Sequence, residues 1–440
     1  MSIVNYHPFF YNTLKKAINL FNKLNMNVPQ SAKKHEAGIN LSILGLCTVA
    51  FLGMTLRTKM LFNIPFINYN YLSDAHAHFA FNGWVTLGLI VLMIRHILPA
   101  EFQKKAIYWW LTGSIFFFSW VLLFTYAAEG NGHFSTIFST LLIFATYIFT
   151  WVFIRDAFKA KVNKIVLLLS VGALLSLVLS SGGAFMIAYL FSVQSLNGIL
   201  YRDALFTYLH FQYNGFFSLA ALALLFQYFI PFLDSKGIRV LKWFSILLTC
   251  SVLPSLFLSY LWQDPRPLFW VVAVIGSILV FLSFLWFVMS IGVMRKSFHN
   301  LSPIVKYLFS VAILAFAVKL FLQGFLIIPV VGDQVFGNRP IIMAFLHLVF
   351  LGFVTHFLLG YYSNSGILNV RSIFTRFALI LFSTAVICNE AILAMQGLSF
   401  MFTLGYSFCL WVLWVIGIFL FIGALFIGIS RMITARTNSI

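Results

Sequence analysis

Residues 78–84 read "HFAFNGW", and the same pattern returns twice, as "HFQYNGF" from His210 and as "HLVFLGF" from His347. Each copy is a histidine, three residues, Asn or Leu, a glycine and an aromatic residue. The successive histidines are 132 and 137 residues apart in a chain of 440. This nearly constant spacing predicts three copies of one structural unit.

The composition is that of an integral membrane protein, because 62% of the residues are hydrophobic and 9% are charged. Apolar runs long enough to cross a bilayer recur along the whole chain. They predict an all-α membrane protein with twelve transmembrane helices in three four-helix pseudo-repeats, at about 36–160, 161–300 and 301–430 of a single domain 36–440. The expected spans are 38–56, 75–98, 106–127, 134–154, 164–191, 204–230, 240–262, 268–292, 302–328, 341–361, 371–393 and 400–430.

The positive charges predict the direction of these spans. If the N-terminus is cytoplasmic, 22 of the 28 Lys and Arg residues lie in cytoplasmic segments and five in outer loops. This bias follows the positive-inside rule, so we expect cytoplasmic N- and C-termini. The net charge of +18 is then a topological signal, and nucleic acid is excluded as a partner. Residues 1–35 are expected to form an interfacial amphipathic segment, with a flexible tail as the alternative, and residues 57–74 an outer loop.

The three motif histidines are expected at one depth, because the even-numbered spans all run from the outer to the inner side. His78, His210 and His347 would then converge on a shared interior and bind iron, copper or zinc through neutral imidazole. His356, nine residues after His347, is either another metal ligand or a buried hydrogen-bonding residue. His76 points about 200° away from His78, so the two cannot serve one metal face. One of them would ligate while the other bonds the backbone or faces a neighbouring site.

Polar residues at fixed distances from the histidines are candidates for ligand contacts. Asn82 and Asn214 follow their histidines by four residues, where an amide could orient the ring or bond a ligand. Arg202 and Arg339 precede theirs by eight, which is about 12 Å along a helix and close to the distance from a haem iron to its propionates. The alternative for both arginines is an ordinary interfacial role.

With these motifs, the chain resembles subunit I of the haem–copper oxidase superfamily, which has twelve helices in three arcs and its ligands on helices 2, 6 and 10. "HAHFAFNGW" resembles a string found on helix 10 of the cytochrome-cbb branch, although here it stands on helix 2. The resemblance implies His78 and His347 as axial ligands of a b-type haem, and His210 as a ligand of a second centre. It also implies a bacterial cytoplasmic membrane, an electron-donor protein or other respiratory subunits as partners, and lipid around the bundle.

The sequence departs from that family at the copper site. The expected pair of histidines on helix 7 is absent from "LPSLFLSYLWQ", residues 253–263, and Asn214 replaces a tyrosine. Copper therefore remains possible, but a complete copper site is not expected. The "HFAFNGW" and "HLVFLGF" strings also resemble those of the NnrS family, which contains haem and copper and is associated with nitric oxide stress.

The expected function is haem binding, for respiratory electron transfer or for the handling of nitric oxide or oxygen. Two alternatives remain at this stage. Twelve spans are common in secondary transporters, although these usually consist of two six-helix halves. The histidines could also serve a structural or assembly subunit through hydrogen bonds alone.

Overall fold

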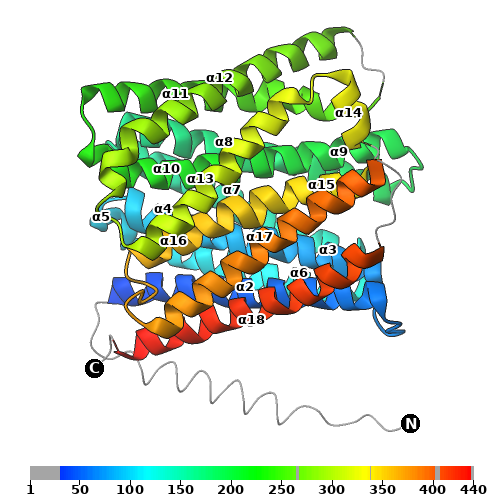
Figure 1. The fold of residues 1–440 in the computed structure, drawn as a ribbon, viewed down its shortest axis with the longest axis horizontal. Coiled ribbons are helices and arrows are strands. Elements are labelled where there is room, and N and C mark those ends of the chain that lie inside the picture. Colours follow the sequence, from blue (N-terminus) through cyan, green and yellow to red (C-terminus); the bar gives the residue numbers. More distant parts are fainter. Residues whose placement is uncertain (1–29, 264–266, 337, 402–406, 438–440) are drawn as a thin grey trace.

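The computed structural model describes residues 30–263, 267–336, 338–401 and 407–437 (Figure 1). These residues form helices and connecting turns, without a β-strand, and twelve of the helices are long and apolar enough to cross a membrane. Along the chain, the helices that make up these spans are α2 (Gln30–Leu61); α3 (Tyr69–Phe79), η1 (Ala80–Thr86) and α4 (Leu87–Ile97); α6 (Ala106–Glu129); α7 (His133–Lys159); α8 (Lys164–Ser192); α9 (Gly198–His210), η2 (Phe211–Phe217), α10 (Ser218–Phe229) and η3 (Ile230–Phe232); α11 (Ser235–Ser255) and η4 (Leu256–Tyr260); α12 (Pro267–Phe298); α13 (Pro303–Phe325); α15 (Arg339–His347), η5 (Leu348–Thr355) and α16 (His356–Asn364); α17 (Ile373–Met401); and α18 (Ser407–Thr437). Two short helices, α5 (Ala100–Gln103) and α14 (Pro329–Phe336), lie between spans.

The prediction of twelve membrane helices is confirmed, and each observed span overlaps the range expected from the sequence. The outer loop between the first two spans is shorter than predicted, since α2 continues to Leu61 and α3 begins at Tyr69. The early start of α3 has a local cause. The side chain of Asn68 accepts hydrogen bonds from the backbone N–H groups of Asn70 and Tyr71, which caps the first turn.

The expected amphipathic segment at 1–35 lies almost entirely outside the described residues. Helix α2 begins, and α18 ends, at the left-hand end of the bundle in Figure 1. The two ends of the described bundle are therefore on one side, as an even number of spans requires. That this side is the cytoplasmic one remains a prediction.

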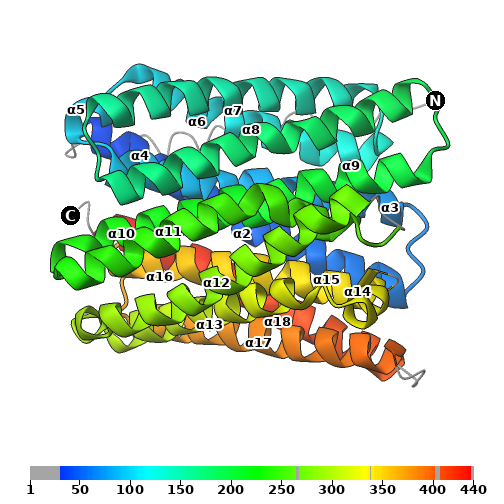
Figure 2. The same cartoon turned by 90° about the horizontal axis from the view of Figure 1, so that it is seen from above.

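The helices form a closed arrangement in which the last packs against the first. Helix α18 lies between α17 and α2, while α6, α7 and α8 follow one another along one edge of the bundle (Figure 2). The second and sixth spans lie inside, with 89% and 72% of their most apolar windows buried, against 33% for α12 and α18. Because lipid tails are as apolar as these side chains, this burial reflects packing between helices.

Each copy of the sequence motif contains a π-helical segment. The segments η1, η2 and η5 begin two, one and one residue after His78, His210 and His347. A π-helix widens the backbone by one residue per turn, is rare, and occurs frequently at functional sites. The same distortion at the same place in spans 2, 6 and 10 supports the interpretation of three related units.

The centre of the bundle is filled by one aromatic residue from each copy. Phe81, Tyr213 and Phe350 each lie three residues after a motif histidine. Their ring centroids are 5.3 Å (Phe81–Tyr213), 5.7 Å (Phe81–Phe350) and 6.3 Å (Tyr213–Phe350) apart. Such pairs contribute about 0.5–1.5 kcal/mol each beyond the area that they bury. We call these three residues the central triad.

Candidate haem chamber and the positions of the histidines

The three motif histidines do not meet, which corrects the expectation of a shared interior. The central triad occupies the place where spans 2, 6 and 10 come together, and the histidines, three residues earlier, point away from it. His78 faces α6, His210 faces α11, and His347 faces the space between α3 and α15. Each histidine therefore lies in a different space between helices.

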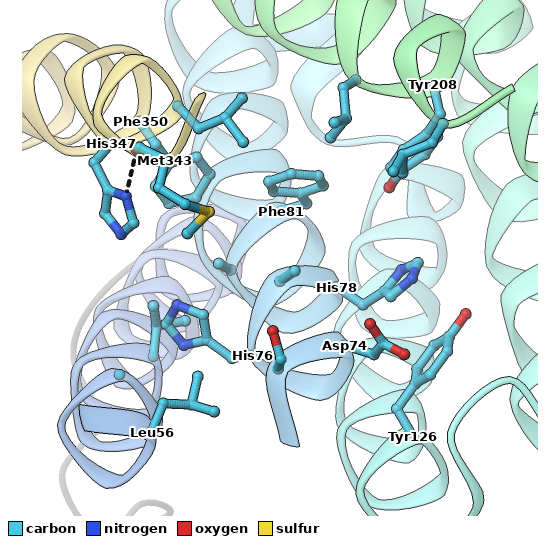
Figure 3. A pocket seen from close by; sticks show the side chains of 18 of the residues that line it. Leu56, Asp74, His76, His78, Phe81, Tyr126, Tyr208, Met343, His347 and Phe350 are labelled. Carbon is cyan, nitrogen blue, oxygen red and sulfur yellow. Dashed lines mark hydrogen bonds between the residues drawn. The ribbon is translucent and has the colours of Figure 1, made fainter. Parts of the chain in front are cut away.

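A cavity of about 820 Å³ extends to both sides of α3. We call the part lined by α2, α3, α15, α17 and α18 the first chamber, and the part lined by α3, α6, α7, α8 and α9 the second chamber. Phe81 lies between them (Figure 3). The total volume is in the range that proteins use for cofactors and other organic ligands.

His76 and His347 both line the first chamber, and their rings are turned into the same space (Figure 3). They come from different spans, α3 and α15. The two imidazoles are close enough to interact electrostatically. The guanidinium group of Arg57 is also close enough to interact with each of them. The structure thus brings His76, rather than His78, opposite His347.

The hydrogen bond at His347 leaves one ring nitrogen for the chamber. Its Nδ1 lies 2.7 Å from the carbonyl oxygen of Met343, one turn earlier. Because a carbonyl can only accept, Nδ1 carries the proton and Nε2 is left with its lone pair. This is the arrangement by which proteins usually fix a metal-binding histidine.

His76 is held by close packing against α2. Its Cε1 would lie 3.3 Å from a side chain built at Gly53, so the glycine makes room for the ring. Its Nδ1 is buried and has no hydrogen-bond partner among the described residues. This nitrogen faces α2, near Gly53 and the backbone of Val49, so Nε2 is the ring nitrogen left for a ligand in the chamber.

Positive charge lines the first chamber at the C-terminal end of α2 and the N-terminal end of α15. Arg57 and Lys59 come from the last turns of α2, and Arg339 from the first turn of α15. Arg202 does not line the cavity. Its guanidinium carbon lies 4.2 Å from the ring centroid of Trp262 and 5.2 Å from that of Phe206.

His210 lies in a closed space between η2 and α11. Its Nε2 donates to the backbone carbonyl of Val252 at 2.7 Å, and its Nδ1 lies 3.0 Å from Nδ2 of Asn214. The carbonyl of Val252 is available because α11 passes into the 3₁₀ segment η4 just beyond it. Both nitrogens of His210 are therefore engaged within the protein.

The remaining sequence candidates have structural partners. His356 is fully buried, with Nδ1 2.7 Å from the carbonyl of Leu351 and Nε2 2.7 Å from the hydroxyl of Ser383. Asn82 donates from Nδ2 to the backbone carbonyl of His78 at 3.0 Å, whereas Asn214 contacts the ring of its histidine. The described residues contain no group of three or more His, Cys, Asp or Glu side chains that could hold a metal ion.

Comparison with known proteins supports the fold. No family model and no curated protein matches the chain. Among solved structures, a chain of a haem–copper terminal oxidase dimer matches with a TM-score of 0.67 and 13% sequence identity, over 91% of this chain and 84% of that chain. At this identity the match shows the fold, and the protein is a multi-pass helical membrane protein with the fold of a haem–copper oxidase chain.

Several residues of the chambers were not identified from the sequence. Gly53, Arg57 and Asp74 do not belong to the repeated motif, and Tyr126 lies in an ordinary apolar run. The two-residue spacing of His76 and His78 was the one available signal, because it places two imidazoles on opposite sides of a single helix.

Proposed function

We propose that the first chamber binds a b-type haem between His76 and His347, and that the protein carries electrons within the membrane. The observation that carries this proposal is the pair of imidazoles from α3 and α15 turned into one cavity, with three cationic side chains near its outer end.

The residues of the first chamber fit such a group in three respects. His347 offers Nε2 because Met343 fixes its other nitrogen, and His76 offers Nε2 because its Nδ1 is buried against α2. Arg57, Lys59 and Arg339 supply the positive charge that the carboxylates of a haem require. The wall between these groups is largely apolar, with Leu46, Val49 and Phe350, and the amides of Asn389 and Gln396 lie at its α17 side.

A haem held by His76 and His347 would supply one-electron chemistry, which suits electron transfer better than gas chemistry because both imidazoles would be engaged. The chain itself holds the two rings. Met343 fixes the tautomer of His347, and Gly53 permits the approach of His76 to α2. We propose no copper centre, because both nitrogens of His210 and of His356 already have partners in the protein.

This function would place the protein in the cytoplasmic membrane of a bacterium, with an electron-donor protein or other respiratory subunits as partners. A secondary transporter is less favoured, since the π-helical segments recur in three spans and not in two halves. A purely structural subunit would not need two imidazoles turned into a cavity. Handling of nitric oxide or oxygen would require one histidine to release its axial position.

Purification of the full chain in mild detergent, followed by a reduced-minus-oxidised visible spectrum and electron paramagnetic resonance, tests the proposal. We expect a low-spin signal typical of two imidazole ligands. His347→Ala should abolish this low-spin signal, while His299→Ala, at an exposed inner position, should leave it unchanged. A folded protein without a Soret band would refute the proposal.

A further inference from the structure

The second chamber differs from the first in the chemistry of its walls. Asp74 and His78 are one turn apart on the same face of α3, and Tyr126 of α6 and Tyr208 of α9 lie beside them (Figure 3). The exposed ring of Tyr201 lines it at the start of α9. The deeper lining is apolar or small, with Ile143, Ala184 and Leu205.

The aromatic rings surround the chamber rather than fill it. His78 stacks on Tyr126 with ring centroids 4.2 Å apart and an angle of 7° between the planes, and its ring lies 6.2 Å from that of Tyr208. Unlike His210, His347 and His356, His78 has no hydrogen bond to its ring nitrogens from any described residue. Because His78 and Tyr126 cover one face of each other, the surfaces left for a ligand are the ring nitrogens of His78, the ring of Tyr208 and the part of Tyr126 that lines the cavity.

The charge of the second chamber is negative. Asp74 lies within the second span, and its closest described polar contact is Nδ2 of Asn131 at 3.4 Å. No Lys or Arg among the described residues forms a salt bridge with Asp74 or lines this side of α3, whereas three line the first chamber. Asp74 is half-buried, and a partly buried carboxylate attracts a cation more strongly than a carboxylate in bulk water does.

We propose that the second chamber binds an organic monocation, namely a tertiary or quaternary amine with an apolar body. The charge would lie between Asp74 and the rings of Tyr126 and Tyr208 that line the chamber, since aromatic rings attract ammonium groups through their quadrupoles. The apolar body would lie against Ile143, Ala184 and Leu205. This site is independent of the proposed haem and does not require it.

A comparison of two isosteric probes on the full chain in detergent tests the charge requirement without any mutation. Benzyltrimethylammonium should bind saturably, measured by calorimetry and by a rise in the temperature of unfolding. Its neutral isostere, neopentylbenzene, should bind at least about tenfold more weakly, since only the charged probe is attracted by Asp74 and by the aromatic rings. Equal affinity for the two probes would refute the proposal.

Single substitutions test which residues of the second chamber bind the cation. Asp74→Asn and Tyr126→Leu should each weaken binding of benzyltrimethylammonium at least tenfold. Asp203→Asn is the matched control, because Asp203 accepts hydrogen bonds from Trp262 and Gln263 outside the chamber and its loss should leave the affinity unchanged. Unchanged binding in a folded Asp74→Asn variant would contradict the assignment.

A second probe tests the role of His78. Benzyldimethylammonium carries one N–H that a ring nitrogen of His78 can accept, so it should bind more tightly than the quaternary probe. His78→Leu should abolish this difference while binding of the quaternary probe persists. If the preference survives in His78→Leu, the histidine is not a ligand contact.

Discussion

The space around His347 and the space around His210 begin from the same seven-residue pattern and the same π-helical distortion, yet one is open and the other is closed. His347 has one nitrogen fixed by its own helix and the other facing a cavity. His210 has one nitrogen on Val252 of α11 and the other on Asn214. The difference lies in the neighbouring helices. Across the cavity from His347 lies His76, for which Gly53 of α2 makes room, whereas His210 meets the end of α11 with its free carbonyl of Val252.

The comparison shows that the repeated motif determines the position of each histidine in its span. The adjacent helix determines whether a ring nitrogen of that histidine is free to bind a ligand. Elsewhere in the bundle, aromatic rings pack between α12, α13 and η5, where the ring of Phe316 lies 4.6 Å from that of Phe353 and 4.9 Å from that of Phe287.

The largest effect is expected from closing the first chamber. Gly53→Leu should displace the ring of His76, because even the Cβ atom would begin 3.3 Å from its Cε1. We expect the haem content per protein to fall at least about tenfold, as for the loss of a supporting group at a metal site. Gly113→Leu on α6, where an added Cβ meets nothing within 4 Å, is the control. Full haem content in Gly53→Leu would refute the proposed position of His76.

The next effect concerns the central triad, through which spans 2, 6 and 10 pack against one another. Phe350→Ala should lower the free energy of unfolding by about 3–5 kcal/mol, because Phe350 packs against Phe81, Tyr213 and Phe217. Reversible unfolding in mixed micelles measures this. A loss below about 1 kcal/mol would show that the triad does not hold the three units together.

A smaller effect is expected in the closed space. His210→Ala leaves the carbonyl of Val252 and the amide of Asn214 without their partner, at a cost of about 1–3 kcal/mol in unfolding free energy. The visible spectrum should not change. Loss of the haem signal in His210→Ala would contradict the contrast between the two spaces.

The smallest effect is expected at the mouth of the first chamber. Arg339 is exposed, so its contribution to an anionic group is screened by solvent. Arg339→Gln should weaken haem binding by less than about fivefold, measured by transfer of haem to an acceptor protein. An effect as large as that of Gly53→Leu would show that Arg339 is enclosed by the bound group.

The fold was largely predictable because hydrophobic length and positive charge determine transmembrane topology. The overlap of all twelve spans follows from this. The length of the loop at 57–74 was overestimated, because Arg57 and Lys59 are polar and mark the end of an apolar run. In the structure both residues belong to α2, which continues to Leu61. Asn68 then starts α3 earlier than the apolar pattern indicates.

The sequence predicted which helices carry the candidate site, but it did not predict which side chains of these helices face each other. The repeat identified spans 2, 6 and 10, and the spacing of His76 and His78 showed that they face opposite sides. Which side faces His347 depends on the rotation of α3 in the bundle, and this is determined by Phe81 in the central triad and by the close approach of α2 at Gly53. Neither contact has a local signal in the sequence.

The central claim is that His76, and not His78, completes the site with His347. Haem content and the low-spin signal of His76→Ala and His78→Ala, purified side by side with wild type, test it most directly. The account predicts loss of the bis-imidazole signal in His76→Ala and a wild-type signal in His78→Ala. The reverse result, with haem retained in His76→Ala and lost in His78→Ala, would contradict it.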